Sequence, residues 1–191
     1  MSIALILVDI QNDFLPGGKL SVPHSEKILP VVEDLVLNNR WFDYIVSTQD
    51  WHPKNHVSFK KWPSHCVMNS FGAKLHKGID CWNVIRFKKG SNKDIDSYSI
   101  FKDEEGNNNE DFIKFIVNKN VDTVFICGLA LDYCVKETAL DAVKYFDMKT
   151  FVITDACCST SLDGGMMANT AMLLEGVGMV TSAFLKNNVK I

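Results

Sequence analysis

Short apolar runs alternate with helix-like patterns along this chain. The run "IALILV" at residues 3–8 is continuously apolar, which is typical of a parallel strand that is buried on both faces. From residue 25 to residue 36, apolar side chains recur at intervals of three and four, which predicts a helix with one buried face. The alternation favours an α/β protein in which helices cover both faces of a parallel sheet.

The complete pattern predicts six strands and four helices. Strands are expected at 3–8, 44–48, 83–87, 123–128, 150–155 and 177–182, and helices at 25–36, 110–119, 132–146 and 163–174. With 191 residues, 47% of them hydrophobic, the chain can bury one sizeable core. We therefore expect a single domain over residues 1–191, with a three-layer α/β/α architecture and a central, mainly parallel six-stranded sheet.

Two segments do not follow the alternation. Residues 10–24 and 49–82 are long and contain prolines and glycines. Loops longer than about twelve to fifteen residues in a compact domain are usually functional, so a site is expected there. The stretch "DEEGNNNED" at 103–111 is polar throughout and predicts an exposed, dispensable loop.

Charge and composition exclude some classes of partner and leave others open. The chain has 20 Lys and Arg against 23 Asp and Glu, a net charge of −3, so neither nucleic acid nor an anionic membrane is expected as a partner. No apolar run is long enough to span a bilayer, and the N-terminal run lacks the basic residues of a signal peptide. We expect a cytoplasmic protein, with a nuclear or organellar location as the alternative.

Residues with chemical potential collect where the predicted strands end. In open parallel sheets, ligands bind outside the carboxyl ends of the strands. Four consecutive strands are followed there by a carboxylate, a carboxylate with an imidazole, a pair of lysines and a thiol. In chain order these residues are Asp9, Asp50 with His52, Lys88 with Lys89, and Cys134.

Cys134 stands at the predicted start of a helix. The helix dipole there lowers the pKa of a thiol, and a nearby acid such as Asp9 can take its proton. Backbone N–H groups at the same helix start can hold an oxyanion. A small buried cysteine is the alternative, but an acid and a lysine at the same edge favour a nucleophile. The other cysteines have no CxxC spacing and are expected to be free core residues; they are Cys66, Cys81, Cys127, Cys157 and Cys158.

Two choices within this group stay open on spacing alone. Asp9 is costly to bury unless it is paired, yet it can also cap a loop, and Asp13 competes for the role of base. Lys88 and Lys89 point in opposite directions if the strand continues through them, and spacing does not choose between them.

The segment "DWHPKNHVSF" indicates a metal site. Asp50 and His52 are one residue apart, so both can reach one ion, and His65 is a third candidate from the next loop. One carboxylate and two imidazoles suit Zn, Fe or Mn and leave positions open for substrate. Surface histidines on a polar loop are the alternative interpretation, and His24 and His76 are expected to be of that kind.

Four motifs, taken in chain order, resemble the nicotinamidase branch of the isochorismatase-like cysteine hydrolases. The similarity covers nearly the whole chain. The segments are "LILVDIQNDFLPGGKLSV", "STQDWHPKNHVSF" with "WPSHCV", "KKGSNKDIDSYSIF" and "GLALDYCVKETALDA". The family more often has threonine at the position of Leu131, to which no catalytic role maps.

The resemblance implies the isochorismatase-like fold and the hydrolysis of nicotinamide through a cysteine thioester. It assigns Asp9 as base, Cys134 as nucleophile and Lys89 as the catalytic lysine, because the family's lysine directly precedes a glycine. The N–H groups of Ala130 and Cys134 form the implied oxyanion hole, with a cis peptide between Leu129 and Ala130.

The resemblance also implies a metal clamp for the pyridine nitrogen. The implied ligands are Asp50, His52 and His65, and His56 is left outside this set. The ion is expected to be Zn²⁺, with Fe²⁺ or Mn²⁺ as alternatives. Three aromatic residues are implied as pocket walls, against the simpler interpretation as core aromatics. These are Phe14, Trp62 and Tyr98.

The expected partners are small molecules, namely nicotinamide and pyrazinamide, and a homo-oligomer is left open. Hydrolysis of nicotinamide would serve NAD salvage. One rival is a related hydrolase that acts on another small amide or a ureido compound. The other is a silent, zinc-bearing interaction domain, which would not need Asp9, Lys89 and Cys134 together.

Overall fold

The computed structural model describes residues 1–38, 40–80 and 84–188, and contains one six-stranded sheet. The strands are β1 (Ser2–Val8), β2 (Tyr44–Asp50), β3 (Ile85–Lys89), β4 (Val121–Leu129), β5 (Lys149–Cys158) and β6 (Gly178–Val180). Their order is β3-β2-β1-β4-β5-β6, and every neighbouring pair is parallel. The predicted parallel sheet is therefore confirmed.

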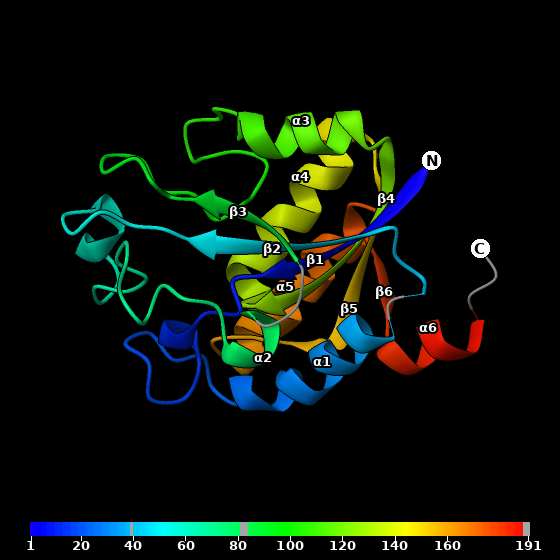
Figure 1. Ribbon diagram of the computed structural model, residues 1–191, viewed down its shortest axis with the longest axis horizontal. Helices are drawn as coiled ribbons and strands as arrows, with labels where there is room; N and C mark the ends of the chain where they lie inside the picture. Colours follow the sequence, from blue (N-terminus) through cyan, green and yellow to red (C-terminus); the bar gives the residue numbers. More distant parts are fainter. Residues whose placement is uncertain (39, 81–83, 189–191) are drawn as a thin grey trace.

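Helices cover both faces of the sheet (Figure 1). They are α1 (Leu29–Leu37), α2 (Lys77–Asp80), α3 (Glu110–Asn118), α4 (Lys136–Phe146), α5 (Leu162–Leu174) and α6 (Ser182–Asn188). Successive residues of β1 point to opposite faces. Leu5 and Leu7 join the core that includes α1, α2 and α6, whereas Ala4, Ile6 and Val8 join the core that includes α3, α4 and α5. The predicted three layers are confirmed.

Two predicted elements differ at their beginnings. The helix expected from residue 25 starts as a 3-10 turn, Ser25–Ile28, which leads directly into α1. The strand expected at 83–87 is observed as β3 at 85–89, and residue 83 lies outside the described part of the chain. The shift places the lysine pair inside the strand instead of after it.

The end of the chain departs further from the predicted pattern. The strand expected at 177–182 is shortened to the three residues of β6, and α6 follows it. The carboxylate of Asp155 accepts hydrogen bonds from the N–H (2.8 Å) and the hydroxyl (2.6 Å) of Ser182. Because Asp155 lies on β5, this capping contact is long-range and does not show in the local pattern.

The polar stretch 103–111 is exposed along most of its length, as predicted, but it is not irregular. Asp103 accepts hydrogen bonds from the N–H groups of Glu105 (3.0 Å) and Asn107 (2.8 Å), which close a turn. Asn109 caps α3 by accepting from the N–H of Phe112. The end of the stretch thus starts a helix.

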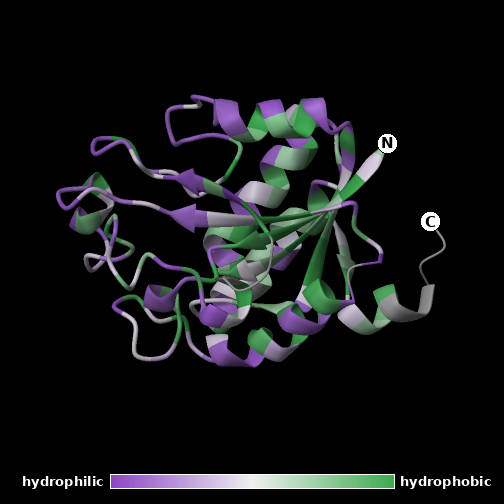
Figure 2. Cartoon of the chain, in the orientation of Figure 1, coloured by the Kyte–Doolittle hydropathy of each residue, from purple (hydrophilic) through white to green (hydrophobic). Residues whose placement is uncertain are grey.

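The carboxyl ends of β1, β2, β3 and β4 meet at one edge of the sheet, at the left of Figure 1. Residues 10–24 and 51–76, which belong to the two long segments, lie beyond this edge. Figure 2 shows hydrophobic central strands and mainly hydrophilic loops beyond β2 and β3. Within the described part of the chain, no helix combines the length and the apolar character that crossing a bilayer requires.

Candidate active site

A buried lysine joins the other two residues predicted to be catalytic. The Nζ atom of Lys89 lies 2.9 Å from Oδ2 of Asp9 and 3.4 Å from Sγ of Cys134. It also pairs with Asp50 and donates to the carbonyl of Ser97 at 3.0 Å. Asp9, Lys89 and Cys134 expose 0%, 4% and 6% of their surface. Acid, ammonium and thiol therefore form one cluster that is almost closed to solvent.

The ends of two neighbouring strands fix the position of Asp9. The residue follows β1 directly and has a positive φ of 49°. The hydroxyl of Thr48, on β2, donates to Oδ1 of Asp9 at 2.6 Å and accepts from its N–H at 3.1 Å. One carboxylate oxygen is thus bound to Thr48, and the other faces Lys89. Thr48 was not predicted to be part of the site, because a threonine in a strand carries no distinctive signal.

The strand pleat separates the two adjacent lysines. Both lie in β3, where Lys89 is buried and Lys88 is exposed. The ammonium of Lys88 lies 3.6 Å from the centre of the Trp51 ring, away from the catalytic cluster. The structure therefore resolves the choice that spacing left open, and brings Lys89 to the cluster.

The pKa of Asp9 is raised, because burial disfavours its charged form and the carboxylate of Asp50 is close, although Lys89 partly offsets both effects. The pKa of Lys89 is raised well above its usual value, because the contacts with Asp50 and Asp9 outweigh burial. A buried carboxylate with a raised pKa is a stronger proton acceptor than an exposed one.

The predicted lowering of the pKa of Cys134 is wrong. Burial and the carboxylates of Asp9 and Asp50 raise the pKa of this thiol well above its usual value, and Lys89 only partly opposes them. A sulfur and one oxygen from each carboxylate lie within 4.8 Å of one another. Cys134 therefore needs a base to remove its proton.

The turn that carries Cys134 is π-helical, Leu131–Val135, and α4 begins only after it. The carbonyl of Ala130 accepts from the N–H groups of Tyr133 and Val135, both at 3.1 Å. The expected cis peptide between Leu129 and Ala130 is present. This turn places the sulfur beside the end of β1.

The three residues predicted as metal ligands lie together and are buried. Nδ1 of His52 lies 2.8 Å from the carbonyl of Gly90, and Nδ1 of His65 lies 2.7 Å from the carbonyl of Pro63. A carbonyl only accepts, so each Nδ1 carries a proton, and Nε2 is the nitrogen that can offer a lone pair to an ion. Those Nε2 atoms are 3.4 Å and 3.8 Å from Oδ2 of Asp50. Two imidazoles oriented by backbone carbonyls and one carboxylate fit a divalent transition metal.

The electrostatics of Asp50 agree with this fit. Burial alone would raise its pKa, but the ammonium of Lys89 holds the pKa well below its usual range. The group is therefore a carboxylate at neutral pH, the form that binds metals.

His56 lies next to the ligand cluster without joining it. Its ring stacks on His52 with a centroid distance of 4.0 Å. Nδ1 accepts from the N–H of Ser58 at 3.3 Å, and Nε2 lies 3.2 Å from the carbonyl of Ile95. Both ring nitrogens are thus engaged with protein atoms, and the ring is neutral.

Gly90 joins the lysine to the metal ligands. It follows Lys89 directly, has a φ of +63°, and its carbonyl orients His52. A Cβ atom at this position would lie 2.5 Å from Cε1 of His52. Only glycine allows both the backbone conformation and the close approach of the ring.

A cavity of about 240 Å³ connects Cys134 with the metal ligands. All three predicted wall residues, Phe14, Trp62 and Tyr98, line it. Nε1 of Trp62 donates to the hydroxyl of Tyr98 at 3.1 Å, which fixes the two rings against each other. Further lining residues were not predicted from the sequence, because the loops that carry them have no distinctive pattern. They include Leu20, Val22, Asp96, Tyr133 and Thr160.

Asp13, the rival candidate for the base, has a different position. Its Oδ2 accepts from the N–H of Cys66 at 2.8 Å and its Oδ1 from the N–H of Lys19 at 3.2 Å. Cys66 follows the ligand His65, and Lys19 precedes the cavity residue Leu20. Asp13 therefore ties the metal loop to the cavity wall.

The other four cysteines that the structure describes stay outside this site. Cys66, Cys127, Cys157 and Cys158 carry free thiols, and Cys81 lies outside the described residues. His24 is exposed and His76 partly buried, and neither lies among the grouped ligands.

The fold and this site define a known class of protein. The profile of the Isochorismatase domain matches residues 3–184. The chain therefore belongs to the isochorismatase family.

Its similar relatives include nicotinamidases and pyrazinamidases. A nicotinamidase of Acinetobacter baylyi is 37% identical over 201 residues, which cover 94% of this chain and 92% of the relative. The structure of PnC1 from L. infantum in complex with nicotinate is 34% identical, with a TM-score of 0.90, and covers 95% and 93% of the two chains. A pyrazinamidase of Pyrococcus horikoshii in complex with zinc is 34% identical, with a TM-score of 0.82, over 95% and 99%.

Proposed function

We propose that this chain, as one domain, is a metal-dependent amidohydrolase that converts nicotinamide to nicotinate and ammonia. One observation carries the proposal: a single cavity brings Cys134 together with Asp50, His52 and His65. The names of the similar proteins support the same substrate class. The nicotinate that is released would serve NAD salvage.

In the first half of the reaction, Cys134 attacks the carboxamide carbon. Asp9 takes the thiol proton, and Lys89, 3.4 Å from the sulfur, stabilises the thiolate. The carbonyl oxygen becomes an oxyanion, which the N–H groups of Ala130 and Cys134 stabilise. The oxyanion then collapses, the C–N bond breaks, and ammonia leaves with the proton that Asp9 held.

In the second half, water attacks the thioester. Asp9, again a carboxylate, takes a proton from the water, and the new C–O bond replaces the C–S bond. The proton on Asp9 returns to the sulfur of Cys134, the acid product loses its remaining proton to solvent, and the carboxylate leaves. The raised pKa of Asp9 suits both proton transfers, because a base with a pKa nearer to neutrality works more efficiently.

Asp50, His52 and His65 would hold one divalent ion, which we propose to be Zn²⁺, with Fe²⁺ or Mn²⁺ as alternatives. When bound, it supplies a Lewis acid for the ring nitrogen of the substrate. The zinc in the Pyrococcus horikoshii relative supports this choice. Phe14 and Tyr98 would then contact the ring faces.

A substrate panel tests the assignment. The purified chain is loaded with zinc, and ammonia release is measured with nicotinamide, pyrazinamide and a ureido compound of similar size. We expect turnover of the first two and little of the third, with Cys134→Ala as the blank. A rate on the ureido compound above that on nicotinamide would contradict the proposal and favour the rival hydrolase.

A further inference from the structure

Asp96 is a buried carboxylate in the cavity to which the mechanism gives no role. It lies beyond β3, exposes 8% of its surface and lines the cavity. One of its oxygens lies within 4.8 Å of a ring nitrogen of His52 and of one of His56. Asp96 therefore adds a negative charge next to the metal ligands.

This carboxylate has no cationic partner in the part of the chain that the structure describes. Its Oδ1 accepts a hydrogen bond from the N–H of Ser97 at 2.8 Å, and none of the ion pairs includes it. A buried charge without compensation is costly. Such a carboxylate needs a positive charge from outside the chain.

In the metal-loaded site, the adjacent rings do not supply that charge. His56 is neutral, because its Nδ1 accepts a hydrogen bond from Ser58. His52 would bind an ion through Nε2, which also requires the neutral ring. The buried ammonium of Lys89 already pairs with Asp9 and Asp50.

The buried charged side chains near the metal ligands carry an excess of negative charge. The carboxylates of Asp9, Asp50 and Asp96 contribute three negative charges, and Lys89 contributes one positive charge. With both imidazole rings neutral, as ion binding through Nε2 of His52 requires, these buried side chains sum to −2 before the charge of the ion is added. One divalent ion brings this sum to zero, and without Asp96 the sum would be +1.

We propose that Asp96 determines the charge selectivity of the cavity: it keeps the metal-loaded site neutral, so that a neutral carboxamide binds and the anionic carboxylate is released. The inference rests on the proposed function, in which substrate and product differ by this one charge. A cavity with a net positive charge would retain the product.

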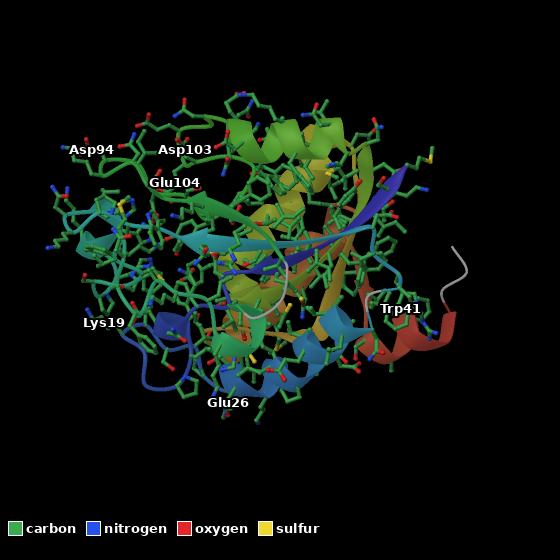
Figure 3. The ribbon with its side chains drawn as sticks, in the orientation of Figure 1. Lys19, Glu26, Trp41, Asp94, Asp103 and Glu104 are labelled. Atoms are coloured by element: carbon green, nitrogen blue, oxygen red, sulfur yellow. The ribbon has the colours of Figure 1, made fainter. Side chains whose placement is uncertain are left out.

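The test measures binding instead of turnover. Asp96→Asn and Asp96→Ser, each made in a zinc-saturated Cys134→Ala background, are titrated calorimetrically with nicotinamide and with nicotinate. Asparagine keeps the shape and the acceptor for the N–H of Ser97, and serine removes the same charge with a different shape. The control is Asp94→Asn, since the side chain of Asp94 is 71% exposed and lies at the periphery of the molecule (Figure 3).

Both Asp96 variants should bind nicotinate about tenfold or more tightly than the Cys134→Ala parent does, as an unopposed charge at close range implies. Affinity for nicotinamide should stay within about threefold, and Asp94→Asn should match the parent. The pair pyrazinamide and pyrazinoate should repeat this difference. High salt should reduce the gain in nicotinate affinity.

Failure of the selectivity proposal and failure of the proposed function give different results. If the chain with Cys134 intact hydrolyses nicotinamide but neither Asp96 variant changes the ratio of the two affinities, the selectivity proposal alone is overturned. An equal change in Asp94→Asn would overturn it too. If the intact chain does not hydrolyse nicotinamide at all, the proposed function falls, and the selectivity proposal with it.

Discussion

Replacing Lys89 by methionine should damage both the stability and the activity of this protein, while the same change at Lys88 should do little. Methionine has a similar length and no charge, so the substitution removes mainly the ammonium. The two lysines are neighbours on β3, but Lys89 lies in the catalytic cluster and Lys88 lies on the surface. Each variant is thus the control for the other.

The expected loss in the free energy of unfolding follows from the groups that each ammonium contacts. Without Lys89, the carboxylates of Asp9 and Asp50 stay buried within 4.8 Å of each other and without their cation. Breaking a buried ion pair in this way costs about 3–5 kcal/mol of the free energy of unfolding. Lys88 loses only its contact with Trp51, which is worth about 0.5–1 kcal/mol at an exposed site.

Urea denaturation gives the free energy of unfolding, and ammonia release gives kcat/KM below the urea transition. We expect kcat/KM to fall by at least about a hundredfold in Lys89→Met, because proton transfer from Cys134 loses its stabilising cation. Lys88→Met should stay within about threefold of the parent chain. Equal losses in the two variants, or the larger loss in Lys88→Met, would refute the placement of Lys89 in the cluster.

Three further predictions concern the thiol, the metal and the loop contacts. Cys134→Ala should abolish ammonia release and leave the fold intact by circular dichroism, whereas Cys157→Ala keeps most activity; residual turnover of a tenth or more in Cys134→Ala contradicts the thioester. His65→Ala should bind zinc at least about tenfold more weakly than His24→Ala in a chelator competition, since it lacks a ligand; equal zinc affinities would argue against the site. Asparagine at position 13 can accept only one of the two hydrogen bonds that Asp13 accepts from backbone N–H groups, so Asp13→Asn should lower the free energy of unfolding by about 1–3 kcal/mol and raise KM. An unchanged KM would show that the cavity wall does not depend on Asp13.

The sequence predicted the sheet because the signals for it are local. A continuous apolar run such as residues 3–8 identifies a strand without reference to the rest of the chain. The features that were wrong or missing depend on distant contacts. The last strand is short because Asp155 caps the helix that starts at Ser182, and no pattern within 177–182 contains that information.

The site was likewise predicted where its signals are local and was missed where it depends on distant contacts. Strand ends identified Asp9, Asp50 and Cys134 as neighbours, because parallel strands deliver their ends to one edge. The pKa of Cys134 was predicted in the wrong direction, since the prediction considered only its own helix and not the carboxylates that two other strands bring to it. Asp96 escaped notice for a related reason: its burial and its place in the cavity are set by loops from elsewhere in the chain.

The glycine after Lys89 has a consequence for how this enzyme family can vary. Gly90 is covalently attached to the residue that neutralises Asp9, and its carbonyl holds the ring of His52. The residues for bond cleavage and those for substrate orientation are therefore linked by one peptide bond. A displacement of the backbone at this point shifts both sets of side chains at once. Evolution toward a different substrate would thus find it easier to delete the metal ligands than to reposition them.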